Sequence, residues 1–287
     1  MLMPVYAGSV NRWECDENDH LNVRFFAQKM QQTLQFGLIE SGLATQKNVD
    51  DMCRGVVSQH MRHQAEARIA VPITGFFGLI EVSSGQITVL TELRNTTTEI
   101  VLATYLITIS GDFSHLPAST TACPDYAEPR GIEANDFYLA DRTSEELKHL
   151  GCTVIGRGVI QPEECDPDGY LQTFMYMGRN SDSMPNLFSR FEDDERGQGV
   201  VGGAVLEYRL NRFGHLRQGS RFELMSGIKS IGEKIQTFVH VLFDVDTGKM
   251  ITGSEAVAIS MDLVARKSIP IPDGRRQRME KLLIVSQ

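Results

Sequence analysis

Long hydrophobic runs, an excess of basic residues and a leader-like N-terminus are what this sequence lacks most clearly. Of its 287 residues 41% are hydrophobic, yet no apolar stretch approaches the roughly 18–20 residues that a membrane-spanning helix needs. The first residues, MLMPVYAGSV, have neither the basic nor the apolar segment of a secretory signal. The formal net charge of −9 argues against nucleic acid or an anionic membrane as a partner, because their binders present a basic face.

Cysteine is also scarce. The five cysteines are odd in number, and no two of them have the spacing of a metal-binding pair. Reduced thiols in a cytoplasmic protein are the simplest interpretation, and we expect neither a metal site nor a bound cofactor. The remaining composition, with 23% charged residues, is that of an ordinary globular protein that is long enough for two domains.

What the sequence does contain is an internal repeat. The segment ECDENDHLN at 14–22 matches ECDPDGYLQ at 164–172, with four identical residues at an offset of 150. A turn between two later strands matches at the same offset, whereas EAR at 66–68 matches EYR at 207–209 at an offset of 141. The second copy would then be nine residues shorter before that strand and nine longer after it. Agreement at three places in the same order predicts an internal duplication.

Each copy is expected to begin with a short strand, and a long helix follows in the first copy at 25–41. Apolar residues such as Phe26 and Leu34 recur there at helical spacing, and Gly42 supplies a stop. In the second copy Pro185 is expected to open a turn or a second short helix. Antiparallel hairpin strands follow in both copies. We therefore predict an α+β fold, in which a sheet wraps a long central helix in each repeat.

The predicted domains are 1–111 and 151–287, joined by a linker at 112–150. Prolines with scattered Ser and Thr mark this linker as an extended segment. A short helix capped by Thr143 or Ser144 is expected near its end.

Asp16, Asn18, His20 and Asn22 lie at alternate positions where the first strand gives way to the long helix. In an extended backbone all four side chains would point to one side. They would lie just before a helix N-terminus, with its unpaired N–H groups and partial positive charge. This arrangement suits acyl transfer, since the N–H groups can stabilise an oxyanion while the carboxylate attacks or activates water. The alternative is a helix cap with His20 packed in an interface, and the spacing alone fits it equally well.

The segment DENDHLN at 16–22 resembles the Asp-x-Asn-x-His-Val-Asn-Asn motif of hotdog-fold thioesterases, above all the plant acyl-carrier-protein thioesterases and their bacterial relatives. Separately, ECDPDG at 164–169 resembles the Asp-Cys-Asp-Pro-x-Gly motif of bacterial 4-hydroxybenzoyl-CoA thioesterases. Each motif is short, but the resemblance covers most of the chain through the repeat. It implies a double hotdog, with two repeats that each wrap a long central helix in an antiparallel sheet.

Carried over residue by residue, the resemblance makes Asp16 the catalytic carboxylate. Asn18 would position the thioester or the carboxylate, and His20 would orient or hydrogen-bond the attacking water. In the second copy Tyr170 stands where His20 does, so the Asp166 site would be weaker, degenerate or reliant on its carboxylate alone. We favour Asp16 over Asp166 as the working site, with Tyr170 as a substrate contact.

The same resemblance places the oxyanion donor on the backbone at the helix start, here around Val23 and Arg24, with Asn22 beside the substrate. Val23 stands where the family has a second Asn, which puts that polar contact in doubt. The plant-type enzymes also use a Glu from a following strand, for which Glu66 is the candidate. The matching Glu207 could instead pair with a neighbouring arginine.

Other residues could be mistaken for catalytic groups. Cys15 invites a thiolate mechanism, but it adjoins Asp16 on an expected strand and would point to the opposite side, so buried packing is the better interpretation. Trp13 is expected in the core. His60 and His63 lie on a predicted strand and face different ways, and we expect both at the surface or in an interface.

A thioester carried on coenzyme A brings phosphates, which bind basic side chains. The clearly basic stretch of this acidic chain surrounds Arg275 and Arg276 near the C-terminus. A solvated tail explains this stretch equally well. Because an acidic carrier protein would prefer a broader basic surface, the overall charge favours coenzyme A.

The leading hypothesis is hydrolysis of an acyl-CoA to free acid and coenzyme A, the latter being part of the substrate. One alternative is a hotdog enoyl-CoA hydratase or dehydratase, whose motif places His five residues after Asp with a Pro between them. His20 is four residues after Asp16, which favours the thioesterase. A non-catalytic acyl-binding module is the second alternative. Hotdog units bury sheet edges or helix faces against partners, so we expect a homodimer or a larger homo-oligomer.

Overall fold

The computed structural model describes residues 2–83, 85–114, 120–133, 137–191 and 201–284. In these residues the chain forms five α-helices and strands that pair antiparallel within each unit. Contacts divide the protein into two compact units, which we call the first and the second unit. The first comprises Met1–Arg130 and Gln172–Gly178, and the second comprises Gly131–Leu171 and Arg179–Gln287.

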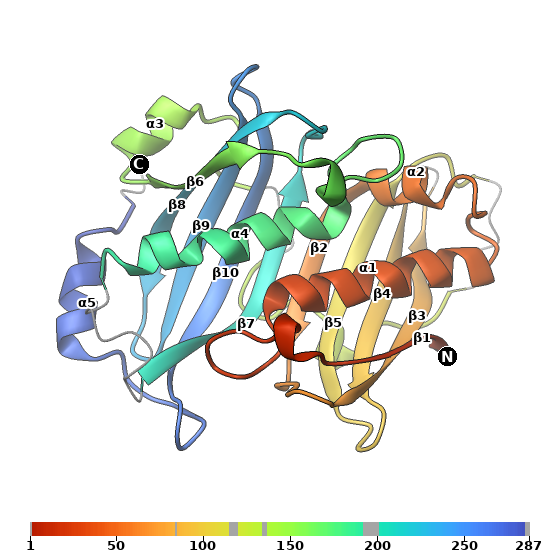
Figure 1. The fold of residues 1–287 in the computed structure, drawn as a ribbon, viewed down its shortest axis with the longest axis horizontal. Helices are drawn as coiled ribbons and strands as arrows, with labels where there is room; N and C mark the ends of the chain where they lie inside the picture. The colour runs from red at the N-terminus through yellow and green to blue at the C-terminus, as the bar shows by residue number, and fades with distance from the viewer. Residues whose placement is uncertain (1, 84, 115–119, 134–136, 192–200, 285–287) are drawn as a thin grey trace. The chain divides into compact units, whose positions relative to one another are not determined.

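The first unit has the strand order β1-β3-β4-β5-β2, and α1 crosses one face of these strands (Figure 1). Its elements are β1 (Met3–Ser9), η1 (Arg12–Glu14), α1 (Val23–Glu40), α2 (Val49–Arg54), β2 (Val56–His63), β3 (Pro72–Val82), β4 (Gln86–Asn95), β5 (Val101–Ser110) and η2 (Asp125–Ala127). The expected long helix is confirmed as α1.

The buried face of α1 is built from the apolar residues that the helical spacing indicated. Phe26 and Leu34 are almost fully buried, and burying a side chain of this size contributes about 1.5–3 kcal/mol. The helix approaches the sheet most tightly at Gly37, where an added Cβ would lie 2.1 Å from Cγ of Phe77 on β3. Gly42 follows the helix with a φ of +74°, which is the left-handed conformation that ends many helices.

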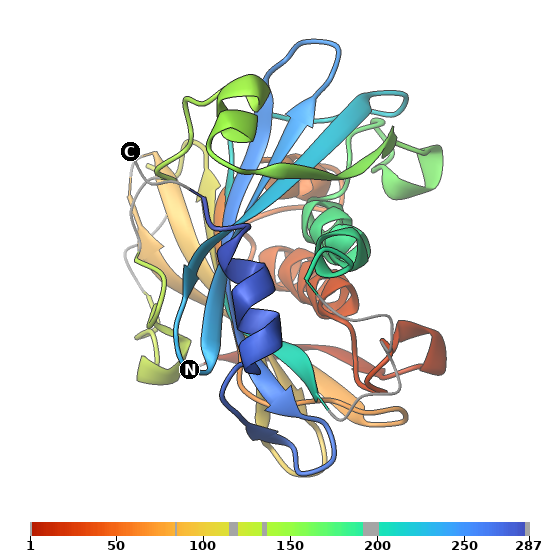
Figure 2. The same cartoon turned by 90° about the vertical axis from the view of Figure 1, so that its left-hand side faces the viewer.

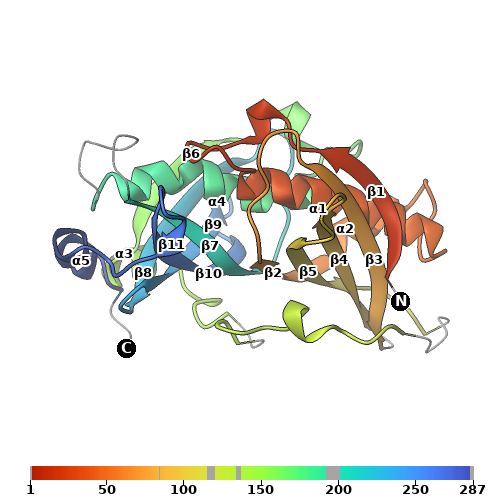
Figure 3. The same ribbon diagram turned by 90° about the horizontal axis from the view of Figure 1, so that it is seen from below.

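The opposite face of the first sheet is covered by part of the expected linker. Figure 3 shows the segment around η2 on the side away from α1. Tyr126 donates its hydroxyl to Oε2 of Glu92 at 2.8 Å, and its carbonyl accepts Nη1 of Arg62 at 2.8 Å. This part of the linker is therefore bound to the first unit.

The second unit repeats the same strand order as β6-β8-β9-β10-β7. Its elements are α3 (Ser144–His149), β6 (Thr153–Val159), η3 (Pro162–Glu164), α4 (Thr173–Phe188), β7 (Val201–Arg212), β8 (Arg221–Ile231), β9 (Ile235–Asp244), β10 (Met250–Asp262), β11 (Lys267–Ser268) and α5 (Asp273–Glu280). The first turns of α4 belong with the first unit. There Thr173 Oγ1 donates to the Cys53 carbonyl at 2.9 Å, and the Phe174 N–H donates to Oε1 of Gln31 at 2.8 Å.

The short helix α3 and the chain that follows the short helix α5 both pack against the second sheet. The expected helix near the end of the linker is confirmed as α3, and Thr143 caps it by accepting the Glu146 N–H. Leu147 of α3 is fully buried in a cluster with Val241 of β9. The chain after α5 lies beside β8, where the Ile284 N–H donates to the Ile228 carbonyl at 2.9 Å (Figure 2).

Pro185 does not break the second long helix. The expected turn at this residue is wrong, because α4 continues through it to Phe188. The last turn is held from both sides: Leu187 is fully buried, and Nδ2 of Asn186 donates to the Ile155 carbonyl of β6 at 2.7 Å. These contacts offset the hydrogen bond that proline removes from a helix.

The strand registers show which residues of the two units correspond. Each register is interrupted at matching places, such as Pro4/Tyr6 and Val154/Gly156, or Leu79/Glu81 and Ile228/Ser230. Recurrent bulges at the same positions are specific features of a fold.

The residues after β2 and β7 correct the sequence alignment of the repeat. Arg68 pairs with His20, and Arg217 pairs with Tyr170. Arg68 therefore corresponds to Arg217 at an offset of 149, and the expected match of Glu66–Arg68 with Glu207–Arg209 is wrong. The two nine-residue insertions that this match required are not needed. Glu207 instead accepts the Gly131 N–H at 2.6 Å and holds the linker on the second unit.

Candidate active site

The acidic motif of the first unit is a tight turn. The Asp16 N–H donates to the His20 carbonyl at 2.9 Å, and the Asp19 N–H donates to the Asp16 carbonyl at 3.1 Å. Asp19 has a φ of 58°, and Gly169 takes a similar φ of 81° at the matching place in the second unit. The expectation of an extended backbone with alternate side chains on one side is wrong, because the chain must reverse direction here.

The turn nevertheless brings the side chains of Asp16 and His20 together. Oδ2 of Asp16 lies 3.1 Å from Nδ1 of His20, and the two side chains are 14% and 13% exposed. Oδ1 of Asp16 accepts the Asn18 N–H at 2.9 Å. An imidazole held at one nitrogen by a carboxylate can act as a base through the other nitrogen. The geometry therefore joins two of the expected site residues in one dyad.

The start of α1 lies immediately after this dyad. Asn22 is the N-cap, and its Oδ1 accepts the Arg24 N–H at 2.8 Å. Its carbonyl accepts the N–H groups of Phe25 and Phe26. No described residue accepts the Val23 N–H. Of the two expected oxyanion donors, Arg24 is therefore engaged by the cap, and Val23 keeps a backbone N–H to offer.

Glu66 does not lie on a strand as expected. β2 ends at His63, and Glu66 is exposed in the loop that follows. The next residue, Ala67, accepts the Leu21 N–H at 2.7 Å, so this loop is tied to the motif. The catalytic role of Glu66 stays a prediction.

The second motif has the same turn but different side chains. Oδ1 of Asp166 accepts the N–H groups of Asp168 at 3.0 Å and of Tyr170 at 2.9 Å. The Tyr170 ring lies 4.4 Å from the guanidinium carbon of Arg217 and 5.8 Å from the His215 ring. Here the turn ends in a phenol that packs between basic side chains.

The basic C-terminal segment is folded against the second unit. Arg275 is buried, with its guanidinium 5.4 Å from the centre of the Phe191 ring. Nη2 of Arg276 donates to the Gly232 carbonyl. These contacts give both side chains a structural role, so we do not carry them into the proposed site as phosphate-binding groups.

Three expectations about neighbouring residues need correction. Trp13 is 75% exposed on η1 and does not belong to the core. His60 is buried, and both ring nitrogens of His63 are buried as well, so of the two expected places, surface or interface, the surface is wrong. Cys15 is half-buried, although buried packing was expected; burial and nearby carboxylates raise the pKa of its thiol, which does not favour a thiolate nucleophile.

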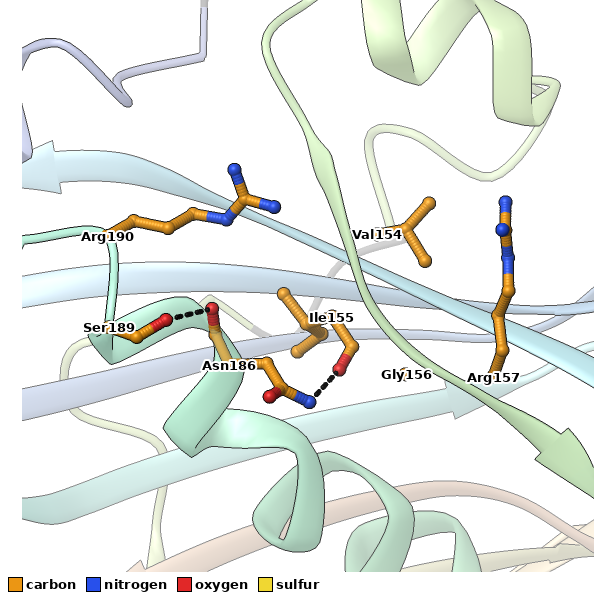
Figure 4. A pocket seen from close by; sticks show the side chains of 7 residues that line it. All are labelled: Val154, Ile155, Gly156, Arg157, Asn186, Ser189 and Arg190. Atoms are coloured by element: carbon orange, nitrogen blue, oxygen red, sulfur yellow. Dashed lines mark hydrogen bonds between the residues drawn. The ribbon is translucent and has the colours of Figure 1, made fainter.

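A depression of about 440 Å³ lies between β6 and the end of α4. Figure 4 shows Asn186 bridging it by its bond to Ile155, with Arg157 and Arg190 at its sides. None of its lining residues belongs to the second motif, which adjoins the other end of α4. Among the described residues no group of His, Cys, Asp or Glu could hold a metal ion. No helix in the same residues is long and apolar enough to cross a membrane.

Comparison with solved structures shows the fold. A 12:0-ACP thioesterase from Umbellularia californica matches with a TM-score of 0.59 and 9% identity, over 90% of this chain and 94% of that one. An acyl-ACP thioesterase from Bacteroides thetaiotaomicron matches with a TM-score of 0.60 and 10% identity, over 90% and 97%. No family model matches the sequence, and no curated protein matches it. The chain has the hotdog fold of these acyl thioesterases, as the motifs indicated.

Proposed function

We propose that this chain is a double-hotdog acyl thioesterase and that the motif of its first repeat performs the hydrolysis. The observation that carries the proposal is the Asp16–His20 pair, 3.1 Å apart, directly before the Val23 N–H at the start of α1. The fold shared with acyl thioesterases supports the reaction class. The repeats are those of the sequence prediction, 1–111 and 151–287, joined by 112–150.

In this mechanism Asp16 orients His20, and His20 is the base. With its Nδ1–H donated to Asp16, the imidazole carries its lone pair on Nε2. That nitrogen takes a proton from water while the water oxygen attacks the carbonyl carbon of the thioester. The Val23 N–H and the positive end of α1 stabilise the oxyanion that forms. The carbon–sulfur bond then breaks, and the proton held by His20 passes to the departing thiolate.

Direct attack by Asp16 on the carbonyl is the alternative within the same site. Both carboxylate oxygens are engaged, Oδ1 by the Asn18 N–H and Oδ2 by His20, and hydrogen bonding lowers their nucleophilicity. A single turnover in ¹⁸O-labelled water separates the two routes. The base mechanism leaves Asp16 unlabelled, whereas label in Asp16 would identify an acyl-Asp16 anhydride that water opens at the aspartate carbonyl.

The second repeat is proposed as the weaker site. Asp166 holds the same turn, but Tyr170 occupies the place of His20, and a neutral phenol is a much weaker base than an imidazole. The role of Tyr170 as a substrate contact stays a prediction.

Coenzyme A is the proposed carrier of the acyl group, and no other cofactor is proposed. The net charge of −9 would repel an acidic carrier protein, because like charges oppose association. The test compares kcat/KM for one acyl group on coenzyme A and on an acyl carrier protein. A higher value on the carrier protein would overturn this choice. A homodimer or larger homo-oligomer and a cytoplasmic location stay predictions.

The decisive experiment measures thiol release from a panel of acyl-CoAs. Asp16→Asn is expected to lower kcat about 10²–10⁴-fold, since it removes the acceptor that orients the base. Asp166→Asn is the matched control and is expected to stay within a few-fold of the unmodified protein. Water addition to a crotonyl thioester without thiol release would identify a hydratase instead. Acyl-CoA binding without either reaction would identify a binding module.

A further inference from the structure

His63, the last residue of β2, is a polar side chain that the proposed mechanism does not use. Both of its ring nitrogens are buried, and neither has a hydrogen-bond partner among the described residues. Its ring packs edge-on against Phe26 at 5.1 Å and Tyr105 at 6.2 Å between ring centres. The residue as a whole keeps some accessible surface, although its two ring nitrogens have almost none.

An imidazole is a poor choice for such a position if packing alone matters. A neutral ring carries one donor and one acceptor, and burying both without a hydrogen-bond partner lowers the free energy of unfolding. Leu or Met would fill the same space without that cost. Burial lowers the pKa of His63 to about 4, and the neighbouring His20 adds to this effect. The ring is therefore neutral at physiological pH and has one N–H to donate.

The location of His63 links it to the candidate site. Phe26, against which the ring packs, is in the first turn of α1, where the Val23 N–H lies. The loop after His63 is tied to the motif through the Ala67 carbonyl and the Leu21 N–H. In the second unit Arg212 occupies the matching register position: it faces Thr252 as His63 faces Ala103. At this register position the first repeat therefore has a neutral imidazole, whereas the second repeat has a guanidinium.

We propose that His63 is a catalytic residue that donates its ring N–H to the carbonyl oxygen of the bound thioester. This inference rests on the proposed thioesterase function of the first repeat. The carbonyl is the polar group next to the scissile carbon, and an apolar acyl chain that reached the ring between Phe26 and Tyr105 would bring no other acceptor. The bound carbonyl supplies the partner that the ring otherwise lacks, and the interaction strengthens as negative charge develops on the oxygen.

The test combines activity with stability. His63→Leu is expected to lower kcat about 10²–10³-fold, as removal of an oxyanion donor does, with little change in KM. Its Tm is expected to equal or exceed that of the unmodified protein, because two unpartnered polar atoms are removed. His63→Gln keeps an N–H donor and is expected to retain at least tenfold more activity than His63→Leu.

Thr91→Val is the matched control. The Oγ1 of Thr91 on β4 is also buried without a partner among the described residues. Thr91 pairs with Tyr105 across the sheet, so the variant removes an unpartnered polar atom near His63 without removing an N–H donor. This substitution is expected to leave kcat within twofold and Tm unchanged or higher.

Three outcomes would overturn the proposal. Unchanged kcat in His63→Leu would exclude a substrate contact. A lower Tm with unchanged kcat per folded molecule would show a packing role. Equal losses in the Leu and Gln variants would exclude donation by an N–H. If the unmodified protein releases no thiol, the proposed function itself fails. An active protein that loses activity in Asp16→Asn but not in His63→Leu contradicts this inference alone.

Discussion

In the first unit the acidic turn ends in an imidazole, whereas in the second unit the matching turn ends in a phenol. The backbones agree, since the Asp16 N–H donates to the His20 carbonyl and the Asp166 N–H donates to the Tyr170 carbonyl. In each turn the aspartate Oδ1 accepts the N–H of the residue two positions later. An aspartate at this place therefore has a structural task whether or not the site is catalytic.

The difference between the turns lies in what the second carboxylate oxygen meets. Oδ2 of Asp16 lies beside His20, but the Tyr170 ring turns toward Arg217 and His215. It follows that the imidazole, rather than the aspartate, distinguishes a site that can move a proton from a turn that only shapes the chain. Exchanging these two side chains tests the comparison most directly.

His20→Tyr is expected to have the largest effect, a fall in kcat of about 10²–10⁴-fold. The phenol does not take a proton from water near neutral pH, so the base contribution is lost. Tyr170→His, the reciprocal change, is expected to leave kcat within a few-fold, because the first repeat keeps its Asp16–His20 pair. Steady-state thiol release measures both.

Unfolding by urea serves as the control for this exchange, since equal midpoints would show that the fold is intact. A large loss of kcat in Tyr170→His, with His20→Tyr near normal, would move the working site to the second repeat.

A buried ion pair behind each motif supplies a second comparison. Nζ of Lys29 on α1 lies 2.7 Å from Oε1 of Glu14, and the side chains are 5% and 8% exposed. In the second unit Arg179 pairs with Glu164, with exposures of 18% and 10%. The same cation–carboxylate arrangement is thus more deeply buried in the first unit.

Lys29→Met is expected to lower the free energy of unfolding by about 3–5 kcal/mol, because it leaves the Glu14 carboxylate buried without its cation. Arg179→Met is expected to cost less, since Glu164 is nearer to solvent. Urea denaturation followed by circular dichroism measures both. Adding Glu14→Gln to Lys29→Met should restore part of the loss. Equal small losses in both single variants would contradict the role of burial.

The sequence predicted the elements that depend on local chemistry. The apolar spacing of α1, the Thr143 cap and the antiparallel hairpin strands are each determined by residues a few positions apart, and all three are found. The left-handed position in the acidic turn had a signal as well, because Gly169 marks it in the second copy. In the first copy Asp19 adopts the same conformation, but an aspartate does not signal it as a glycine does. An extended strand was therefore expected there.

The pattern of the sequence could not predict which segments, far apart along the chain, contact one another. The burial of β2 does not alternate, since three consecutive residues around His60 are buried, so its period could not reveal that His63 meets α1. Pro185 signals a break, but its effect depends on Leu187 and on the β6 carbonyl that Asn186 reaches. The match of Glu66 with Glu207 failed because Glu and Arg recur by chance two positions apart, once in the loop after β2 and once in β7.

Each repeat also buries a histidine whose pKa lies well below its ordinary value, and removing these two histidines has the smallest expected effect on stability at neutral pH. Burial lowers the pKa of His63 to about 4 and that of His240 to about 3, against an ordinary value near 6.5. Between pH 6.5 and these values the unfolded chain binds protons that the folded chain does not. The free energy of unfolding therefore falls as the pH falls through this window, by about 3 kcal/mol for the shift of His63 and about 5 kcal/mol for that of His240.

Single substitutions separate the two contributions, because His63 has no hydrogen-bond partner among the described residues whereas Nδ1 of His240 lies 2.9 Å from Oγ of Ser226. His63→Leu is expected to flatten the dependence on pH between 6.5 and 4 without loss of stability at pH 7.5. His240→Leu is expected to flatten it as well, but to lower stability at pH 7.5 because it removes the hydrogen bond between the ring and the Ser226 hydroxyl, which then keeps only its bond to the Val239 carbonyl. Urea midpoints measured from pH 4 to 8 decide this. A lower urea midpoint at pH 7.5 in both variants would mean that His63, like His240, stabilises the fold, and would contradict its proposed role as a substrate contact.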